Sequence, residues 1–192
     1  RYAGFDDSRP IPDQVAALVF RALRETSGDI LVFLPGTGEI RRTSAALEER
    51  GCPALVRELY GDLPFSAQQA ALNPDSGGLR RVVLSTSVAE TSLTIRGITT
   101  VIDSGFSRIP RFDPQTGLTR LVTVPVTHDA ATQRTGRAGR LGPGVCYRLW
   151  EQRKTVLLQP SRKPEVMEAD LSTVLLDFFS WGTSDPYSIG WI

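Results

Sequence analysis

Short, mostly apolar runs that alternate with helical patterns are the feature that most limits how this chain can fold. Each run is only a few residues long, as expected of a strand buried on both faces of a sheet. The runs lie at 30–34, 54–59, 81–85, 101–103 and 145–149. Turns that contain glycine or hydroxyl residues follow several of them and lead into helical patterns. This alternation predicts an α/β fold built on a mostly parallel sheet.

The length allows one full domain of this kind. With 192 residues, the remainder is too short for a second domain of the same size. Residues 1–27 are expected to hold a linker and the first helix, and 28–150 the domain itself. The segment 151–192 is expected to hold a short helix at 151–158, a linker and the start of a helical domain. Apolar residues recur there at helical spacing over 171–181, so one face needs a partner. We expect the chain to be a piece of a longer protein.

Charge and cysteine usage narrow the class of protein. The formal net charge is +1, so bulk electrostatics indicate no nucleic-acid partner and any basic site must be local. Cys52 and Cys146 are far apart in the sequence and lack metal-ligand spacing, which indicates reduced thiols, a cytoplasmic protein and no metal site. No apolar run approaches the ~18 residues that a membrane span needs, so no membrane partner is expected.

The segment 133–140 reads Gln-Arg-Thr-Gly-Arg-Ala-Gly-Arg and carries three arginines at a spacing of three. On a helix, Arg134, Arg137 and Arg140 would point roughly the same way. The two glycines would weaken that helix by about 1 kcal/mol each relative to alanine, a loss expected where something approaches the backbone closely. Arginine forks match phosphate oxygens in geometry and charge. The row therefore predicts a polyphosphate site, and a solvated basic helix or an Arg-Gly nucleic-acid tail is the alternative.

Three stretches together resemble a known family. The octet is similar to motif VI of superfamily 2 helicases. The run Ser-Thr-Ser-Val-Ala-Glu-Thr-Ser-Leu-Thr-Ile at 85–95 and the run Leu-Tyr-Gly-Asp-Leu-Pro at 59–64 agree with it. The chain resembles the second RecA-like domain of DEAH-box RNA helicases, most closely the bacterial HrpB branch. The resemblance is good over residues 28–150 and continues more weakly through 164–171.

The resemblance implies a RecA-like three-layer α/β/α domain with a mostly parallel sheet and an inserted β-hairpin. The hairpin would span 106–124, where two extended arms flank a turn at 113–117. In related helicases a hairpin here is thought to separate strands, and packing on the next domain is the alternative. The segment after residue 150 would begin a winged-helix domain.

For the nucleotide, the resemblance implies roles in one cluster. Arg137 and Arg140 would act as arginine fingers, and Gln133 would help to place the attacking water. The implied nucleotide contacts are Ser92, Thr94 and Arg134. Arg134 is also a candidate to pair with a carboxylate across the cleft and so set the pose of the helix.

For RNA, the resemblance implies contacts from two turns that follow strands. The implied residues are Gly36, Thr37, Thr86 and Ser87. Each turn also has a purely structural alternative. The first would be a tight strand-to-helix turn, and the hydroxyls of the second would cap the short helix that follows.

Two sequence elements that hydrolysis needs are absent from the chain. It contains neither Gly-x-x-x-x-Gly-Lys-[Ser/Thr] nor Asp-Glu-x-His. ATP, or another NTP, with Mg²⁺ would therefore be held mainly by the first RecA-like domain of the same polypeptide, and this chain alone should be inactive. The predicted function is the second motor domain of an ATP-dependent RNA helicase that grips single-stranded RNA.

Other functions stay open at this point. A helicase-like fold also suits a non-catalytic RNA-binding or partner-docking module. A DNA helicase of the same superfamily would share the octet, although the run at 89–95 argues against it. Arg96 and Leu72 stand where many DEAH proteins have an acidic residue near the ribose and a phenylalanine on the base. These departures predict a loose preference among nucleoside triphosphates.

Overall fold

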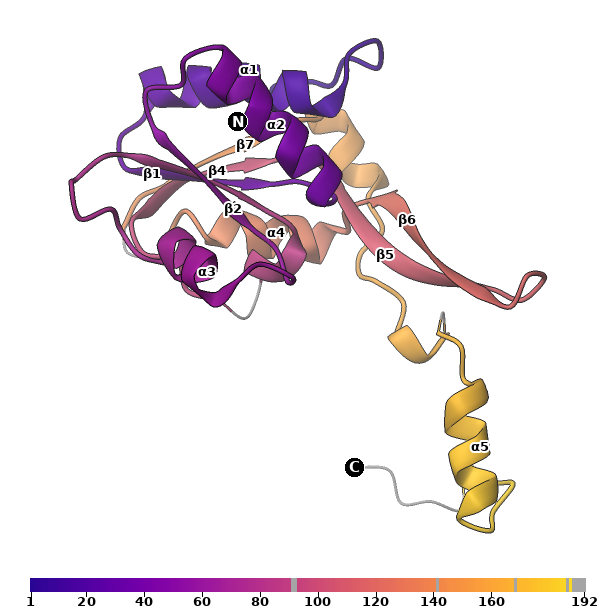
Figure 1. The fold of residues 1–192 in the computed structure, drawn as a ribbon. Coiled ribbons are helices and arrows are strands. Elements are labelled where there is room, and N and C mark those ends of the chain that lie inside the picture. The colour runs from indigo at the N-terminus through magenta and orange to yellow at the C-terminus, as the bar shows by residue number, and fades with distance from the viewer. Residues whose placement is uncertain (91–92, 141, 168, 186, 188–192) are drawn as a thin grey trace. The chain divides into compact units, whose positions relative to one another are not determined.

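A sheet of five parallel strands forms the centre of the fold (Figure 1). In spatial order its strands are β2 (Leu55–Leu59), β3 (Arg81–Ser85), β1 (Asp29–Phe33), β4 (Ile98–Asp103) and β7 (Val145–Arg148). The computed structural model describes residues 1–90, 93–140, 142–167, 169–185 and 187. Both β1 and β3 are buried along their whole length, because neighbouring strands flank them and helices cover the sheet. The predicted parallel α/β sheet is confirmed.

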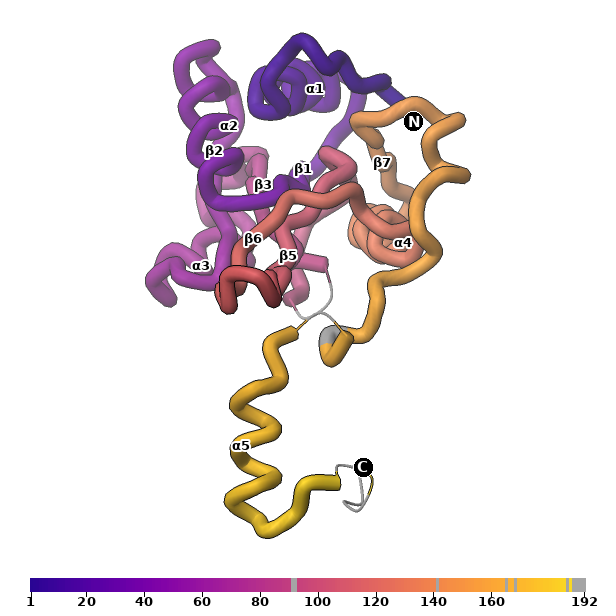
Figure 2. Tube along the Cα trace, turned by 90° about the vertical axis from the view of Figure 1, so that its right-hand side faces the viewer, coloured from indigo at the N-terminus to yellow at the C-terminus, as the bar shows by residue number. Residues whose placement is uncertain are grey.

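Helices cover both faces of this sheet and give the fold three layers (Figures 1 and 2). α1 (Ile11–Glu25) and α2 (Thr37–Glu49) lie on one face, and α3 (Phe65–Leu72) and α4 (His128–Gly136) lie on the other. The side chains of β1 and of Leu34, the residue that follows it, alternate between two cores. Ile30, Val32 and Leu34 pack with α1 and α2, whereas Leu31 and Phe33 pack in the core of the opposite face. The expected α/β/α architecture is present.

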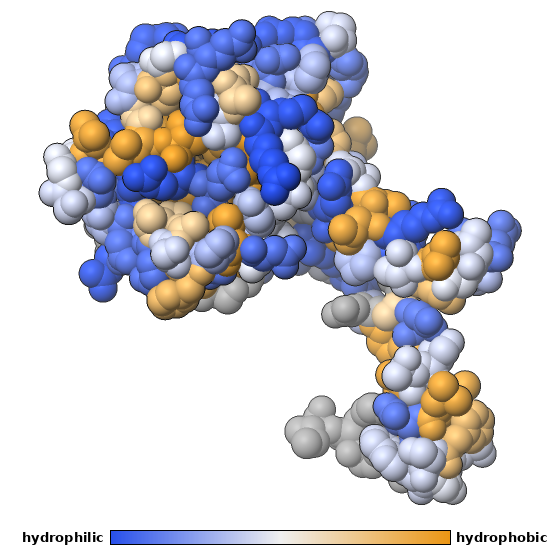
Figure 3. All heavy atoms as spheres, viewed as in Figure 1, coloured by the Kyte–Doolittle hydropathy of each residue, from blue (hydrophilic) through white to orange (hydrophobic). Residues whose placement is uncertain are grey.

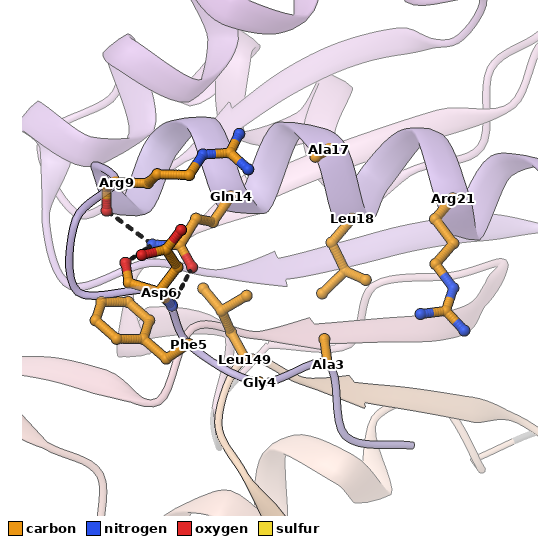
Figure 4. Close-up of a pocket in the computed structure, with 10 residues that line it drawn as sticks. All are labelled: Ala3, Gly4, Phe5, Asp6, Arg9, Gln14, Ala17, Leu18, Arg21 and Leu149. Atoms are coloured by element: carbon orange, nitrogen blue, oxygen red, sulfur yellow. Dashed lines mark hydrogen bonds between the residues drawn. The ribbon is translucent and has the colours of Figure 1, made fainter.

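The N-terminal segment is tied to the domain at two places. Tyr2 bridges to Arg148 of β7, and the Ala3 N–H donates to the Arg148 carbonyl at 2.9 Å. The Gln14 amide of α1 donates to the carbonyls of Asp6 and Arg9 at 2.8 and 2.7 Å (Figure 4). A hollow of about 410 Å³ lies beside these residues. Its central amide is already bonded within the chain, so we read the hollow as a packing feature of this segment.

The chain divides into two compact units, one of residues 1–108 and 123–161 and one of residues 109–122 and 162–192. The hairpin strands are β5 (Phe106–Asp113) and β6 (Leu118–Pro125), so the predicted hairpin is confirmed. Asp113 shapes the turn between them, because its carboxylate accepts from the Gln115 N–H at 3.0 Å and from the Thr116 hydroxyl at 2.9 Å.

Beyond residue 161, the second unit contains a short 3₁₀ helix, η3 (Glu165–Met167), and α5 (Ser172–Ser180). The helical pattern predicted over 171–181 is therefore confirmed. Apolar side chains gather on the surface of α5 (Figure 3). Leu176 and Phe179 are 66% and 55% exposed, which agrees with the expected apolar face in need of a partner.

The short helix expected at 151–158 is present as a 3₁₀ helix, η2 (Gln152–Leu157). Backbone N–H groups there bond three residues back, as in the 2.9 Å bond from Lys154 to Glu151. The Trp150 indole N–H also donates to the Thr155 hydroxyl at 3.1 Å, which holds this tighter turn against the end of the domain.

Candidate functional site

Neighbouring strands end at the same level, and the turns that follow them form one edge of the sheet. Phe33 at the end of β1 pairs with Ser85 of β3 on one side and with Asp103 of β4 on the other. The Leu34 N–H continues this ladder by donating to the Ser85 carbonyl at 2.8 Å. The residues predicted to contact RNA in the two turns are Gly36, Thr37, Thr86 and Ser87. The fold brings both turns to the carboxyl edge, where open α/β sheets bind ligands.

The arginine segment begins as an α-helix and continues as a tighter turn. α4 ends at Gly136, and the backbone N–H groups of residues 137–139 bond three residues back at 3.1 to 3.3 Å. The expectation that one α-helix carries all three arginines is therefore wrong, because only Arg134 lies within α4. A turn with three residues per repeat still brings residues three apart to one side. Arg134, Arg137 and Arg140 accordingly all contact the segment 90–94.

Arg134 is fully buried and uses its guanidinium within the domain. The acceptors are Glu90 Oε2 at 2.9 Å, Asp103 Oδ1 at 2.8 Å, the Phe106 carbonyl at 3.1 Å and the Ser107 hydroxyl at 2.6 Å. Burial alone would lower the pKa of this guanidinium, but the carboxylates of Asp103 and Glu90 outweigh it and raise the pKa. Its carboxylate partners thus come from this chain, whereas the sequence suggested one from across a cleft. Arg134 fixes the start of the row.

Arg137 is held by backbone carbonyl groups. Its Nε donates to the Glu90 carbonyl at 2.9 Å and its Nη1 to the Leu93 carbonyl at 2.6 Å. Only 7% of the residue is exposed. Burial, and next the positive charge of Arg140, lower the pKa of the Arg137 guanidinium. Because carbonyl groups carry no net charge, these bonds orient the cation without neutralising it.

Arg140 is the exposed end of the row. Its Nη1 donates to the Thr94 hydroxyl at 3.1 Å, and both residues are exposed. Gln133 is also exposed, at the residue before Arg134. The structure therefore brings together Arg140 and Thr94 among the predicted nucleotide residues. Ser92 lies outside the described residues.

The glycines around the row differ in what surrounds them. An ideal Cβ at Gly144 would lie 2.2 Å from the Ala138 carbonyl oxygen, so close packing within the domain requires that glycine. Among the described residues, an ideal Cβ at Gly136 or Gly139 would meet no atom of another segment within 4 Å. The described part of the chain thus gives no packing reason for these two glycines.

A three-residue turn connects the two sets of predicted residues. η1 (Ser87–Ala89) begins after Thr86, whose hydroxyl accepts from the Val88 N–H at 3.5 Å, so the capping role of Thr86 is confirmed. Glu90 follows directly, with its carboxylate on Arg134 and its carbonyl on Arg137. Thr86 and Ser87 therefore directly precede the residue that holds two of the arginines.

Sequence reasoning missed several polar residues of this edge. They are Glu39, Glu90, Asp103, Ser107 and Arg108. Glu90 lies within the run at 85–95, and Asp103 ends a buried strand, so a carboxylate expected to need a partner was the available signal at both positions. No local signal marks Glu39 or Arg108, because their contact depends on two segments about seventy residues apart.

The two departures from the DEAH pattern lie next to each other. The Arg96 N–H donates to the Leu72 carbonyl at 3.2 Å. The Arg96 carbonyl in turn accepts from the buried Arg81 at 2.6 Å, while the Arg96 side chain is exposed. The loose nucleotide preference inferred from these positions stays a prediction.

Within the described ranges, no three or more histidine, cysteine, aspartate or glutamate side chains gather closely enough to hold a metal ion. Among the helices that the structure describes, none has both the length and the apolar content that crossing a membrane requires.

The chain matches one family model and resembles proteins that are named as helicases. Residues 12–142 match the family model described as helicase conserved C-terminal domain. The chain is 43% identical to the ATP-dependent RNA helicase HrpB of Escherichia coli (strain K12), over all of this chain and 24% of that protein. Against the pre-mRNA-splicing factor ATP-dependent RNA helicase DEAH10 of Arabidopsis thaliana, identity is 40% over 84% of this chain and 23% of that protein.

A solved structure shares the fold over the whole chain. The crystal structure of the Escherichia coli DEAH/RHA helicase HrpB matches with a TM-score of 0.93 at 43% identity. The match covers 100% of this chain and 24% of that chain, so the present chain spans only about a quarter of the relative. The RecA-like architecture expected from the sequence is thus shared with a solved helicase.

Proposed function

Because the chain belongs to the family of helicase conserved C-terminal domains, we propose that it is the second motor domain of a DEAH-box ATP-dependent RNA helicase. In this role it supplies arginine fingers for NTP hydrolysis and part of the grip on single-stranded RNA. The first RecA-like domain of the same polypeptide would hold ATP, or another NTP, with Mg²⁺. The similarity to HrpB, which is named as an ATP-dependent RNA helicase, supports this assignment.

The observation that carries the proposal is the graded exposure of the three arginines. Arg134 is 0% exposed, Arg137 is 7% exposed and Arg140 lies on the surface. A guanidinium that only stabilises a fold does not need an exposed cation six residues later. The row instead begins at Arg134, which is held inside the domain, and ends at Arg140, an exposed cation whose position is set by the residues before it. Such preorganised charge stabilises a transition state because little reorganisation is needed when negative charge develops.

In the proposed mechanism, each arginine has its own task. When bound to the first RecA-like domain, the NTP would supply the γ-phosphoryl group that is transferred to water, with NDP as the leaving group, and Mg²⁺ would offset charge on the phosphate oxygens. Arg140 and Arg137 place positive charge on the oxygens of the γ-phosphoryl group, in a reaction that depends mainly on positioning and electrostatics. Arg134 holds the row in place through its bonds to the carboxylates of Asp103 and Glu90. Gln133 helps to orient the attacking water. Thr94 contacts the nucleotide and positions Arg140, and Ser92 is a further proposed nucleotide contact.

Glu90 is the proposed positioning residue of this site. Its side chain bonds to Arg134 and its backbone carbonyl to Arg137, each at 2.9 Å. A shift of Glu90 would therefore move two members of the row together. Since Glu90 directly follows η1, RNA held at Thr86 and Ser87 and a nucleotide beside Arg140 would act on the same element.

The proposed RNA grip uses the two turns at the carboxyl edge. Gly36 is the N-cap of α2 and has no side chain to cap it, which leaves first-turn N–H groups free for a phosphate. Thr37 follows in that first turn, and Thr86 and Ser87 are partly exposed in the neighbouring turn. Hydroxyl and backbone N–H donors at this edge suit the sugar-phosphate backbone of a single strand.

Substituting the fingers tests the proposal. Arg140→Ala and Arg137→Ala in the full-length protein should each lower kcat for RNA-stimulated ATP hydrolysis more than a hundredfold, since arginine fingers contribute about 10³ to 10⁵ in rate. Phosphate release measures the rate, and thermal unfolding checks the fold. Arg21→Ala is the matched control, because Arg21 is an exposed arginine that pairs with Glu25 on α1 at 2.7 Å.

Near wild-type hydrolysis in both finger variants would remove Arg137 and Arg140 from catalysis. If such variants also kept RNA binding, the alternative of a non-catalytic RNA-binding or partner-docking module would be favoured. A loss of rate shared by Arg21→Ala would instead indicate a general effect of removing positive charge, and would also count against the finger role.

A further inference from the structure

The guanidinium of Arg108 lies over the backbone of Gly36. An ideal Cβ at Gly36 would be 2.7 Å from Arg108 Nη1 and 3.0 Å from its Cζ. Gly36 has a φ of −162°, an extended conformation open to any residue. The end of the Arg108 side chain therefore occupies the space that a Cβ at Gly36 would take, and Gly36 needs no special backbone conformation.

Arg108 is paired with Glu39, but the pairing is incomplete. Arg108 Nη2 lies 3.7 Å from Glu39 Oε2, beyond hydrogen-bond distance, whereas Glu39 Oε1 pairs with Arg42 at 2.6 Å. Within the described part of the chain, Glu39 Oε2 and Arg108 Nε are buried and make no hydrogen bond. Buried polar atoms without partners are rare in folded proteins and each destabilises the arrangement that contains it.

The surroundings of Arg108 favour an anion as the missing partner. A cation beside the first turn of α2 is disfavoured by the helix dipole, and the carboxylate of Glu39 offsets that effect. The Arg108 side chain is 34% exposed, so an anion from solvent can reach it. A phosphate would accept from the exposed part of the planar fork, in the geometry that arginine offers to phosphates.

We propose that Arg108 binds a backbone phosphate of the RNA strand, and that Glu39 holds its guanidinium over Gly36 until RNA replaces Glu39 as partner. This inference rests on the proposed RNA grip. It adds Arg108 to the grip as a charged RNA contact, and Glu39 as the carboxylate that competes with RNA for Arg108. Gly36 lies at the same edge as Thr86 and Ser87, so a phosphate within a strand fits a path along that edge better than a free phosphate ion does.

The test measures RNA affinity of the full-length protein across a series of KCl concentrations. Fluorescence anisotropy of a labelled single-stranded oligoribonucleotide is the readout, without nucleotide. Arg108→Ala should weaken binding about three- to tenfold and reduce the slope of log affinity against log salt by about 0.7, the value for one phosphate contact on a single strand. Arg108→Lys should restore most of the slope, because it keeps the charge.

Glu39→Gln should have the opposite effect. Without the competing carboxylate, RNA binding should tighten about threefold. Glu49→Gln is the matched control, since it removes the same charge from the exposed end of the same helix. Thermal unfolding of each variant shows whether the domain is intact.

The outcomes separate this inference from the proposal beneath it. Wild-type affinity and slope in Arg108→Ala, while Thr37→Ala and Thr86→Ala weaken binding, would overturn the role of Arg108 and leave the grip in place. Equal effects of Glu39→Gln and Glu49→Gln would overturn the role of Glu39. If the wild-type protein itself bound no RNA, the proposed RNA grip would fail, and this inference with it.

Discussion

Two buried arginines stand at opposite ends of the same sheet, and their surroundings differ. Arg81 starts β3 at the amino end and is 1% exposed, and Arg134 lies at the carboxyl end and is 0% exposed. Arg81 pairs with Asp29 through Nε and Nη2 at 2.9 and 2.7 Å. It also bonds to the carbonyls of Ala71, Asn73 and Arg96. The Arg81 guanidinium makes five hydrogen bonds and that of Arg134 makes four, so both are held within the domain.

What separates the two sites is the chain that continues from each arginine. Arg81 leads into the buried run of β3. Arg134 leads to Arg137 and Arg140, which are progressively more exposed, and past two glycines at which no other segment of the described residues would contact a Cβ. A buried ion pair is therefore no sign of function by itself. The functional signal at the carboxyl end is the anchored cation followed by cations that reach the surface.

The largest expected effect falls on stability at both ends. Arg81→Ala leaves Asp29 buried without its cation, and Arg134→Ala leaves both Asp103 and Glu90 without theirs. Each variant should lower the free energy of unfolding by about 3 to 5 kcal/mol, the usual loss when one partner of a buried pair is removed. Urea denaturation of this chain measures the change. A loss confined to Arg81→Ala would show that Arg134 does not anchor the carboxyl end.

A smaller effect should distinguish the individual pairs. Double-mutant cycles between contacting residues give coupling energies of about 0.5 to 3 kcal/mol. The Arg134–Asp103 coupling should be largest, because the Asp103 side chain is 0% exposed, whereas those of Glu90 and Asp29 are each 12% exposed. Equal couplings for all three pairs would show that burial of the carboxylate does not set their strength.

The smallest effect on stability should come from the glycines of the row. Gly136→Ala and Gly139→Ala should leave stability unchanged or raise it by at most about 1 kcal/mol, because alanine favours helical backbone. In the full-length protein both alanine variants should lower the rate of ATP hydrolysis, since a Cβ would fill space that the nucleotide or the first RecA-like domain needs beside the row. Gly144→Ala is the contrasting variant, because its Cβ would clash with the Ala138 carbonyl and destabilise the fold. Full activity of Gly136→Ala and Gly139→Ala would show that hydrolysis does not depend on the absence of a side chain at these two positions.

The sequence predicted the sheet and the hairpin because those elements follow from local pattern. Continuous apolar runs marked the buried strands, and Asp113 with Gly117 marked the hairpin turn. The end of α4 at Gly136 was missed, because the spacing of the arginines fits an α-helix and a 3₁₀ turn almost equally.

The partners of the site residues were missed for a different reason. Arg134 and Asp103 are 31 positions apart in the sequence, and Arg137 and Glu90 are 47 apart. Such contacts arise only when parallel strands bring the ends of separate segments together. The sequence could therefore identify the arginine row but not the groups that hold it.

Phe33 gives the fold a constraint that reaches beyond packing. Its ring belongs to the hydrophobic core at 0% exposure, and the Arg134 guanidinium lies 4.9 Å from the centre of that ring. Replacing Phe33 in order to stabilise the core would thus also change the ring that the Arg134 guanidinium contacts. A substitution here would affect thermal stability and catalytic activity together, so a combinatorial library of core residues should keep phenylalanine at this position.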